Sequence, residues 1–181
     1  MQSLEGMRER TIVCNSLSKT YSITGWRLGY VIANPQIIDR VKKVHDFLTV
    51  GAAAPLMEAA VVGLEFGDGY YDELAAHYAH MKEVFVGGLK KLGLKYTDPQ
   101  GAYYVLVDVS EFGVKDDVKF CEWMAQFVGV AAVPGSSFFR EDVHNLVRFH
   151  FAKQDDTLNE AINRLAGLRK AVAEAGDVEW R

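Results

Sequence analysis

Lys19 is the residue of this chain whose surroundings most clearly suggest chemistry. Residues 16–29 read SLSKTYSITGWRLG, so the lysine stands among small hydroxyl residues and Arg27 follows eight positions later, between two glycines. A lysine that forms a Schiff base must be a neutral amine, which requires surroundings that lower its pKa. Hydroxyls and a guanidinium can hold a phosphate group. The segment therefore predicts a Schiff-base lysine beside a phosphate-binding set, whereas a bare Ser-Lys-Thr would indicate only a surface turn.

The spacing of these residues resembles the pyridoxal-phosphate attachment site of class I/II aminotransferases, which are fold type I enzymes. That motif has a small, an apolar and a small residue, then lysine, then a spaced Gly-x-Arg-apolar-Gly, and every position is filled here. The resemblance implies that Lys19 is the catalytic residue and holds pyridoxal 5'-phosphate covalently. It also implies that Ser16 and Arg27 bind the cofactor phosphate. Ser18, next to the lysine, is a further cofactor-binding candidate.

Residues 146–152, LVRFHFA, resemble the late strand of the same family, whose arginine binds the substrate α-carboxylate. Arg148 is the matching residue here. A planar guanidinium holds a carboxylate through two parallel hydrogen bonds, which suits a group common to all α-amino acids. Taken alone, Arg148 would be interpreted as a strand-end arginine in a surface ion pair. Residues 133–138 and 101–104 are also family-like, so the resemblance covers essentially the whole chain.

By this resemblance we expect a pyridoxal-phosphate-dependent aminotransferase that moves an amino group between an amino acid and a 2-oxo acid. A cytoplasmic homodimer is the expected assembly. Lys19, Ser16 and Arg27 also fit another reaction on the same scaffold, such as that of a β-lyase, synthase or decarboxylase. A transcription regulator that carries such a domain, or an inactive remnant that serves in dimerisation, are further alternatives. Arg148 recognises any α-carboxylate, so the pattern does not choose a substrate.

Composition narrows the function classes. The chain has 181 residues, is 49% hydrophobic and 24% charged, and carries a net charge of −4. These values are typical of a globular protein with a sizeable core, and they disfavour nucleic-acid binding through a basic patch. No apolar run is long enough to span a membrane, and the N-terminus does not resemble a signal peptide. Cys14 and Cys121 form no metal-ligand pattern and are expected to be reduced, buried thiols.

The family resemblance also predicts the domain organisation. We expect an α/β fold in which residues 1–98 form the C-terminal part of a large cofactor domain, a mostly parallel sheet with helices, including a bridging helix. Residues 99–181 are expected to form a small α+β domain. Only 18 residues precede Lys19, so the residues that stack on the pyridine ring, pair with its nitrogen and donate to its phenolic oxygen find no match. We therefore expect a C-terminal portion lacking the N-terminal half of the fold, and the isolated chain could be inactive; a miscalled start or a partner chain that supplies the first half are alternatives.

Hydrophobic periodicity predicts the elements that position these residues. Residues 11–14 are β-branched and apolar and predict a buried strand of the parallel sheet, ahead of Lys19 in a turn. The expected elements that follow are a strand over 28–33, helices over 36–49, 55–66 and 70–92, a strand over 103–109, a helix over 116–127, strands over 130–133 and 146–151, and a helix over 155–173. The 55–66 helix is largely apolar, which is typical of a buried helix or a subunit contact.

None of the five histidines is assigned a catalytic role. His77 and His80 stand three apart on a predicted helix, but no cysteine or carboxylate pattern completes a zinc site, so no metal is expected. His150 shares a strand face with Arg148 because side chains alternate along a strand. It could line the substrate site, but a structural role is the preferred interpretation.

Overall fold

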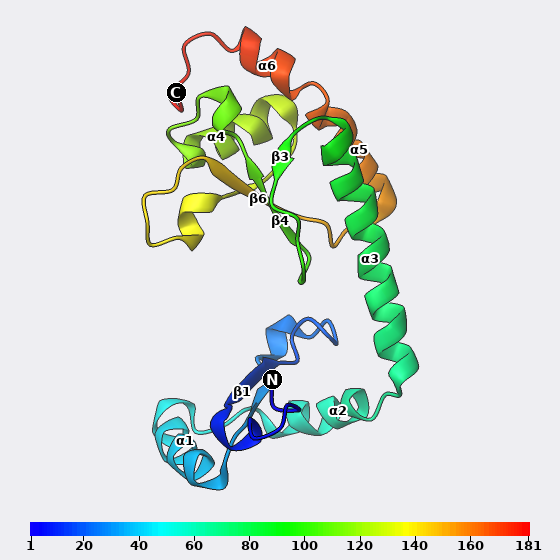
Figure 1. Ribbon diagram of the computed structural model, residues 1–181, viewed down its shortest axis with the longest axis vertical. Coiled ribbons are helices and arrows are strands. Elements are labelled where there is room, and N and C mark those ends of the chain that lie inside the picture. The colour runs from blue at the N-terminus through cyan, green and yellow to red at the C-terminus, as the bar shows by residue number, and fades with distance from the viewer. The chain divides into compact units, whose positions relative to one another are not determined.

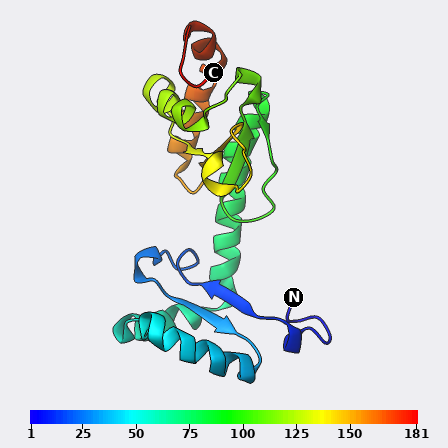
Figure 2. The same ribbon diagram turned by 90° about the vertical axis from the view of Figure 1, so that its left-hand side faces the viewer.

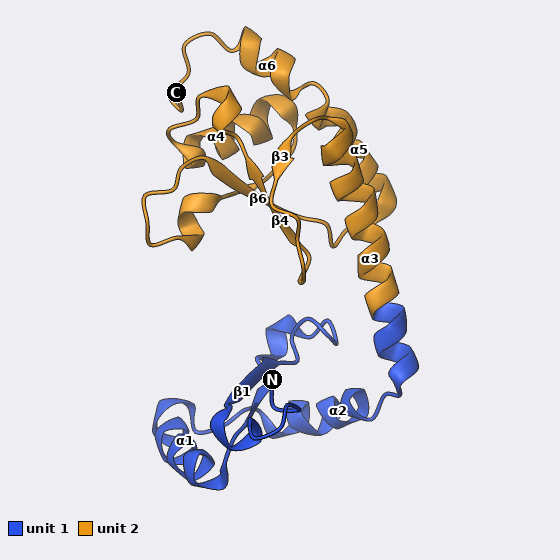
Figure 3. Ribbon diagram, in the orientation of Figure 1, with its two compact units in different colours: residues 1–74 blue, residues 75–181 orange.

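The computed structural model describes all 181 residues, and these divide into two compact units. Unit 1 comprises Met1–Leu74 and unit 2 comprises Ala75–Arg181 (Figure 3). The division falls inside helix α3, Asp68–Lys91, which therefore belongs to both units. The boundary expected after residue 98 lies further along the chain, and it remains a prediction about the family's domains. Helices and strands are mixed, as expected for an α/β chain.

Two short strands form the sheet of unit 1. β1, Val13–Ser16, pairs with β2, Gly29–Ile32 (Figure 2), and the pairing is antiparallel. The expected buried strand of a parallel sheet is therefore wrong for this pair: β2 is exposed along its whole length, and only Val13 of β1 is half-buried. The connection between the strands contains only the 3-10 helix η2, Thr24–Trp26. A parallel pair would need a longer crossover, usually an α-helix.

The helices of unit 1 follow the sequence pattern closely but are less buried than expected. α1, Pro35–Thr49, starts with proline in its first turn, and the Asn34 side chain accepts a hydrogen bond from the Gln36 N–H as an N-cap. α2 spans Ala54–Leu64 and buries only Ala60. Of the two alternatives for this apolar helix, burial is not met within this chain, and a subunit contact stays a prediction. A short 3-10 helix, η1, Arg8–Arg10, precedes β1.

Unit 2 is built on a four-stranded antiparallel sheet in the order β3-β4-β6-β5. Its strands are β3, Lys95–Tyr96; β4, Tyr104–Asp108; β5, Val133–Pro134; and β6, Leu146–His150. β4 and β6 match the predicted strands over 103–109 and 146–151. β3 is too short to show a periodic pattern, and the strand expected over 130–133 is reduced to the two residues of β5.

Alternation along β4 and β6 divides this sheet into two faces. Val105 and Val107 pair with Phe149 and Val147, and all four are buried in the core of unit 2. The C-terminal part of α3 and helix α5, Asp155–Leu165, lie side by side against the sheet (Figure 1) and join the same core. The opposite face carries half-buried side chains, among them Arg148.

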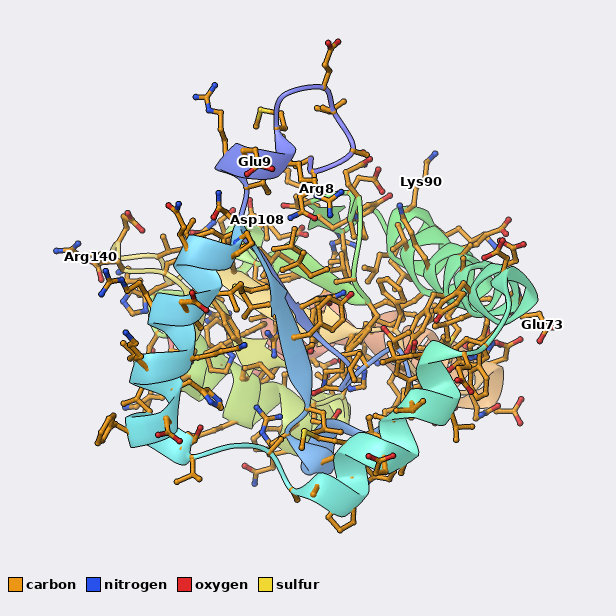
Figure 4. The ribbon with its side chains drawn as sticks, turned by 90° about the horizontal axis from the view of Figure 1, so that it is seen from below. Arg8, Glu9, Glu73, Lys90, Asp108 and Arg140 are labelled. Carbon is orange, nitrogen blue, oxygen red and sulfur yellow. The ribbon has the colours of Figure 1, made fainter.

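The remaining helices complete unit 2. They are the 3-10 helix η3, Ser110–Phe112; α4, Asp117–Trp123, continued by the π-helix η4, Met124–Val128; the 3-10 helix η5, Gly135–Phe138; and α6, Leu168–Glu174. The helix expected over 155–173 is interrupted between α5 and α6, and that over 116–127 changes to π geometry halfway. Lys90 points away from α3 (Figure 4) while its neighbour Leu89 is fully buried. None of the helices is long and apolar enough to cross a membrane.

Candidate active site

The loop that carries Lys19 is closed at its base by the two strands of unit 1. Ser16, the last residue of β1, pairs with Gly29, the first residue of β2. The Leu17 N–H then donates to the Leu28 carbonyl at 3.0 Å. The loop therefore starts and ends at one fixed point, and Lys19 follows directly, in the strand-to-turn position that the sequence predicts.

Glycine is required at position 29 by this pairing. A Cβ at Gly29 would lie 2.5 Å from the carbonyl oxygen of Asn15, a separation that real Cβ atoms do not show. Gly29 therefore allows β1 and β2 to approach closely at the base of the loop. A Cβ at Gly25 would meet nothing within 4 Å, so this second glycine of the motif does not serve a close contact within the chain.

Thr24 connects three of the predicted site residues. Its hydroxyl donates to the Ser18 carbonyl at 3.2 Å and accepts from Lys19 Nζ at 3.3 Å. Its own carbonyl accepts from Arg27 Nη1 at 2.9 Å. The lysine and the arginine, eight positions apart in sequence, are therefore held on one residue.

The two serines of the motif form a second connection. Ser16 Oγ donates to Ser18 Oγ at 2.8 Å, and the Ser18 N–H donates to Ser16 Oγ at 3.2 Å. Ser18 is buried, with 5% of its surface exposed, whereas Ser16 is exposed. The structure therefore brings all four residues of the predicted cofactor site into one hydrogen-bonded loop.

Arg27 has an unusual backbone conformation. It directly follows η2 with φ 56° and ψ 41°, the left-handed region that glycine and asparagine adopt most readily. This conformation costs a residue with a side chain about 1–2 kcal/mol. Backbone strain of this kind clusters at functional sites, where the surrounding structure enforces it. The guanidinium itself is exposed and so is accessible to a ligand.

Two sets of contacts within unit 1 hold the lysine loop in place. Leu17 and Leu28, at its two ends, are buried in a small core together with Ala60 of α2. At its side, Tyr70 Oη donates to the carbonyl of Thr20, and Tyr21 Oη lies 2.7 Å from Tyr71 Oη. The residues on both sides of Lys19 are thus attached to the buried core or to the start of α3.

Arg148 lies in unit 2, on the half-open face of the sheet. It is opposite Leu106 of β4 and Val133 of β5 in the strand register. Its guanidinium carbon lies 4.2 Å from the centre of the Tyr104 ring and 3.9 Å from that of Phe138. Aromatic faces attract a guanidinium and leave its N–H groups, which lie in the guanidinium plane, free to point at a carboxylate.

The other titratable candidates lie outside the lysine loop, and a structural role for them remains a prediction. His80 pairs with Asp155, which raises the pKa of His80 through the hydrogen bond and the negative charge. Partial desolvation, followed by the charges of Lys153 and Arg148, lowers the pKa of His150. No cluster of three metal-ligating side chains is present. Cys121 is buried, and burial raises its pKa to about 12, but Cys14 is exposed on β1, so the expectation of two buried thiols is wrong for Cys14.

Sequence reasoning missed several residues that hold the site. Thr24 lies within the motif. Its hydroxyl, five residues after the lysine and in the same turn, is the sequence signal that could have identified it. Tyr70 and Tyr71 were interpreted only as part of a helix. Asp117 accepts a hydrogen bond from the Ser136 N–H in η5, and the Phe138 ring lies against the Arg148 guanidinium. No periodic pattern in the sequence marks either role.

These residues fit a phosphate-bearing aldehyde. The loop of unit 1 offers one amine for the aldehyde carbon, and two hydroxyls and a guanidinium for the phosphate oxygens. Arg27 uses Nη1 on Thr24, and a guanidinium has five N–H donors. The same donor set would not suit a metal, because it lacks carboxylate, imidazole and thiolate ligands.

Comparisons with known proteins show which family the chain resembles. The family model of aminotransferase class I and II matches residues 2–165. The methionine aminotransferase of Escherichia coli is 37% identical over 163 residues, which are 90% of this chain and 42% of that protein. The aspartate aminotransferase of Pyrococcus horikoshii is 34% identical over 160 residues, 87% of this chain and 40% of that protein.

A solved structure shows the same similarity in three dimensions. The N-succinyldiaminopimelate aminotransferase of Mycobacterium tuberculosis superposes with a TM-score of 0.82 at 33% identity, covering 92% of this chain and 44% of that one. The chain spans less than half the length of the curated relatives it matches. The extent of the family match, over sequence and fold alike, places this chain in the class I and II aminotransferase family.

Proposed function

We propose that this chain provides the cofactor-binding lysine and the substrate-binding arginine of an aminotransferase that acts on an amino acid and a 2-oxo acid. Pyridoxal 5'-phosphate is the cofactor of class I aminotransferases. The observation that carries the proposal is the hydrogen-bonded loop in which Ser18, Lys19 and Arg27 are all joined through Thr24.

In this proposal the loop binds the cofactor at two places. Ser16, Ser18 and Arg27 hold the phosphate. Arg27 forms the stronger bonds, because charge-assisted hydrogen bonds from a guanidinium are stronger than those from hydroxyls alone. Lys19 binds the aldehyde carbon through Nζ. Thr24 Oγ1 keeps Nζ within the loop and so limits the directions in which the amine can approach the aldehyde.

The reaction then assigns one role to each residue. When bound, the cofactor supplies an electron sink for the charge left on the substrate α-carbon. Once the substrate amino group has displaced Lys19 from the cofactor, the freed Nζ would take the proton from that carbon and return it to the carbon that carried the aldehyde. Arg148 binds the α-carboxylate through two N–H groups and so fixes the orientation of the α-carbon, an effect of positioning rather than of chemistry.

The relatives support the substrate class. Their names give methionine, aspartate and N-succinyldiaminopimelate as the compounds on which they act. All three compounds carry an α-amino group and an α-carboxylate. We therefore propose an α-amino acid as the donor and a 2-oxo acid as the acceptor.

We also propose a cytoplasmic homodimer. Both cysteines are free thiols, the state kept in reducing compartments. The exposed apolar side chains of α1 and of the residue after it support a subunit contact, because exposed hydrophobic patches commonly mark such interfaces. They include Phe47, Leu48 and Val50, which are 92%, 73% and 81% exposed.

The direct test is covalent labelling of the purified chain. The chain is mixed with pyridoxal phosphate, reduced with borohydride and mapped by peptide mass spectrometry, alongside the variants Lys19→Ala and Lys42→Ala. Lys42 is the matched control, because it is an exposed lysine of the same unit on α1. We expect Lys19 to carry most of the label, Lys19→Ala to lose it, and Lys42→Ala to keep it.

An equal distribution of label over surface lysines would contradict the proposed role of Lys19. The type of reaction is tested separately, with an amino acid donor and radiolabelled 2-oxo acid acceptor. Transfer of the amino group to the 2-oxo acid supports a transaminase. Release of pyruvate and ammonia, or of carbon dioxide, without any 2-oxo acid would instead indicate a lyase or a decarboxylase.

A further inference from the structure

Asp117 is a fully buried carboxylate at the start of α4, outside the loop of Lys19. Its side chain is 0% exposed. One oxygen, Oδ2, accepts the backbone N–H of Ser136 at 2.8 Å, and the other, Oδ1, accepts from His144 Nδ1 at 3.0 Å. A buried charge is stable only where its hydrogen bonds are satisfied, so these two contacts are the reason the carboxylate can stand here.

The hydrogen bond to Ser136 fixes a short segment of backbone. Ser136 is the second residue of η5, and the residue before it, Gly135, packs so closely on Leu146 that no side chain would fit there. Pro134 of β5 pairs with Val147 of β6. The segment is thus held by β6 on one side and by Asp117 on the other.

Phe138, two residues after Ser136, ends this segment and contacts Arg148. Its ring centre lies 3.9 Å from the guanidinium carbon, closer than the 4.2 Å of Tyr104. Tyr104 comes from a strand that is paired with β6 and needs no further support. Phe138 is 47% exposed and comes from a 3-10 turn, so its place depends on the contacts that hold η5.

We propose that Asp117 is a positioning residue for Arg148: by holding the Ser136 N–H, it keeps the Phe138 ring on the guanidinium and so fixes the direction of the N–H groups of Arg148. The importance of that direction for catalysis rests on the function proposed above. The positioning itself does not, because it is a property of unit 2.

His144 supports the carboxylate from the other side. Its Nδ1 lies 3.0 Å from Asp117 Oδ1 and its Nε2 lies 2.8 Å from Asp142 Oδ1, so both ring nitrogens face carboxylate oxygens. When the ring is protonated, both nitrogens donate and its positive charge offsets the buried negative charge of Asp117. The chain of contacts therefore runs from His144 through Asp117 and η5 to Phe138 and Arg148.

The proposal can be tested on the unaltered chain by nuclear magnetic resonance of the Arg148 side chain. The ring current of Phe138 displaces the Nε–Hε signal of Arg148, and Phe138→Ala defines the position of that signal without the ring. We expect Asp117→Ala to move the signal toward the Phe138→Ala position and to speed hydrogen exchange at the Ser136 amide by about tenfold or more.

Asp116→Ala is the matched control. Asp116 stands next to Asp117 and caps the same helix, its carboxylate accepting the Lys119 N–H at 3.0 Å, but no hydrogen bond joins it to η5. Loss of this cap should lower stability and leave the Arg148 signal in place. If Asp117→Ala does not fold, Asp117→Asn, which keeps the volume, takes its place. In either variant, faster exchange at Ser136 with an unmoved Arg148 signal would overturn the proposal.

A second readout separates this proposal from the proposed function. Pyruvate, a simple 2-oxo carboxylate, is titrated into the unaltered chain while the Arg148 signal is followed. A response that Asp117→Ala weakens several-fold supports both proposals. An unaltered chain whose Arg148 does not respond to pyruvate contradicts the carboxylate-binding role of Arg148, and the ring-current displacement still decides whether Asp117 positions it.

Discussion

The hydroxyls of Tyr21 and Tyr71 lie 2.7 Å apart and join the lysine loop to the first turns of α3. The hydrogen bond to Tyr71, with partial burial and the nearby tyrosines, raises the pKa of Tyr21 to about 12. Tyr70 reinforces the connection, since its ring stacks on that of Tyr21 and its hydroxyl bonds the Thr20 carbonyl. The residues that follow Lys19 are therefore attached to a helix far along the sequence.

This pair gives the first prediction. Replacing Tyr71 by phenylalanine removes the hydroxyl but keeps the ring, so the pKa of Tyr21 should fall from about 12 toward its ordinary value of 10.0. The measurement is a pH titration followed by the carbon signals of labelled tyrosines. Tyr30→Phe serves as the control, because Tyr30 makes only the smallest contribution to the pKa of Tyr21. An unmoved Tyr21 titration in Tyr71→Phe would contradict the pairing.

The two glycines of the lysine motif should respond very differently to replacement by alanine. Gly29→Ala forces a Cβ against the Asn15 carbonyl and should destabilise unit 1 by about 1–3 kcal/mol. Gly25→Ala meets open space and should change stability by no more than about 0.5 kcal/mol. Urea denaturation followed by circular dichroism compares the two. Equal stabilities for both variants would show that β1 and β2 do not approach as closely as described.

The sequence predicted the helices of unit 1 better than its sheet. α1 and its proline start follow from a periodic apolar pattern and a capping asparagine, which are local signals. The direction of β2 relative to β1 is set by the connection between the two strands. The apolar run over residues 11–14 does not indicate which strand it will pair with, or in which direction. For the same reason Cys14 was expected in a core but lies on an uncovered strand.

For the site, the sequence predicted the residues that we propose bind the ligands, but not the residues that hold them in place. Lys19, Arg27 and Arg148 belong to motifs whose spacing can be recognised. Thr24 and Asp117 act through hydrogen bonds to backbone groups. Every residue type has a backbone carbonyl, so such a bond does not require a particular residue type that could be recognised in the sequence. Only the folded chain shows which backbone N–H a buried carboxylate faces.

The pairs around His144 predict how stability depends on pH. Burial alone would raise the pKa of Asp117, but the hydrogen bonds from Ser136 and His144 outweigh it and lower that pKa. The hydrogen bonds to Asp117 and Asp142 raise the pKa of His144 above its ordinary 6.5. Asp117 therefore stabilises the fold above pH 3.8, and loses this effect as pH falls. His144 stabilises it below pH 6.5, and loses this effect as pH rises through its raised pKa.

We accordingly expect unit 2 to be most stable between these limits, and His144→Gln to reduce the decline of its unfolding free energy above pH 6.5. Denaturant unfolding at a series of pH values measures this. His80 adds a decline of the same sign, because Asp155 raises the pKa of His80, so the double variant with His80→Gln should be flatter still. A pH profile of His144→Gln parallel to that of the unaltered chain would contradict the assignment.

Trp180 offers a test of packing near the end of the chain. Its ring is 1% exposed and contacts Phe120 and Trp123, but its Nε1–H has no hydrogen-bond partner. Trp180→Ala should cost about 3–5 kcal/mol of stability, as for other large-to-small core changes. Trp180→Phe should cost much less, because it removes the unsatisfied donor along with part of the ring. Thermal unfolding measures the stability of both variants. Equal losses would contradict the buried Nε1–H group without a hydrogen-bond partner.

The left-handed backbone of Arg27 also bears on how this protein would respond to selection. Glycine or asparagine would occupy φ 56° more easily, so a random library screened for heat resistance alone should accumulate those two residues at position 27. A library screened for phosphate binding should keep arginine there. With the proposed phosphate-binding role of Arg27, thermostability and ligand affinity conflict at position 27, and engineering of this scaffold would do best to leave it unaltered and gain stability elsewhere.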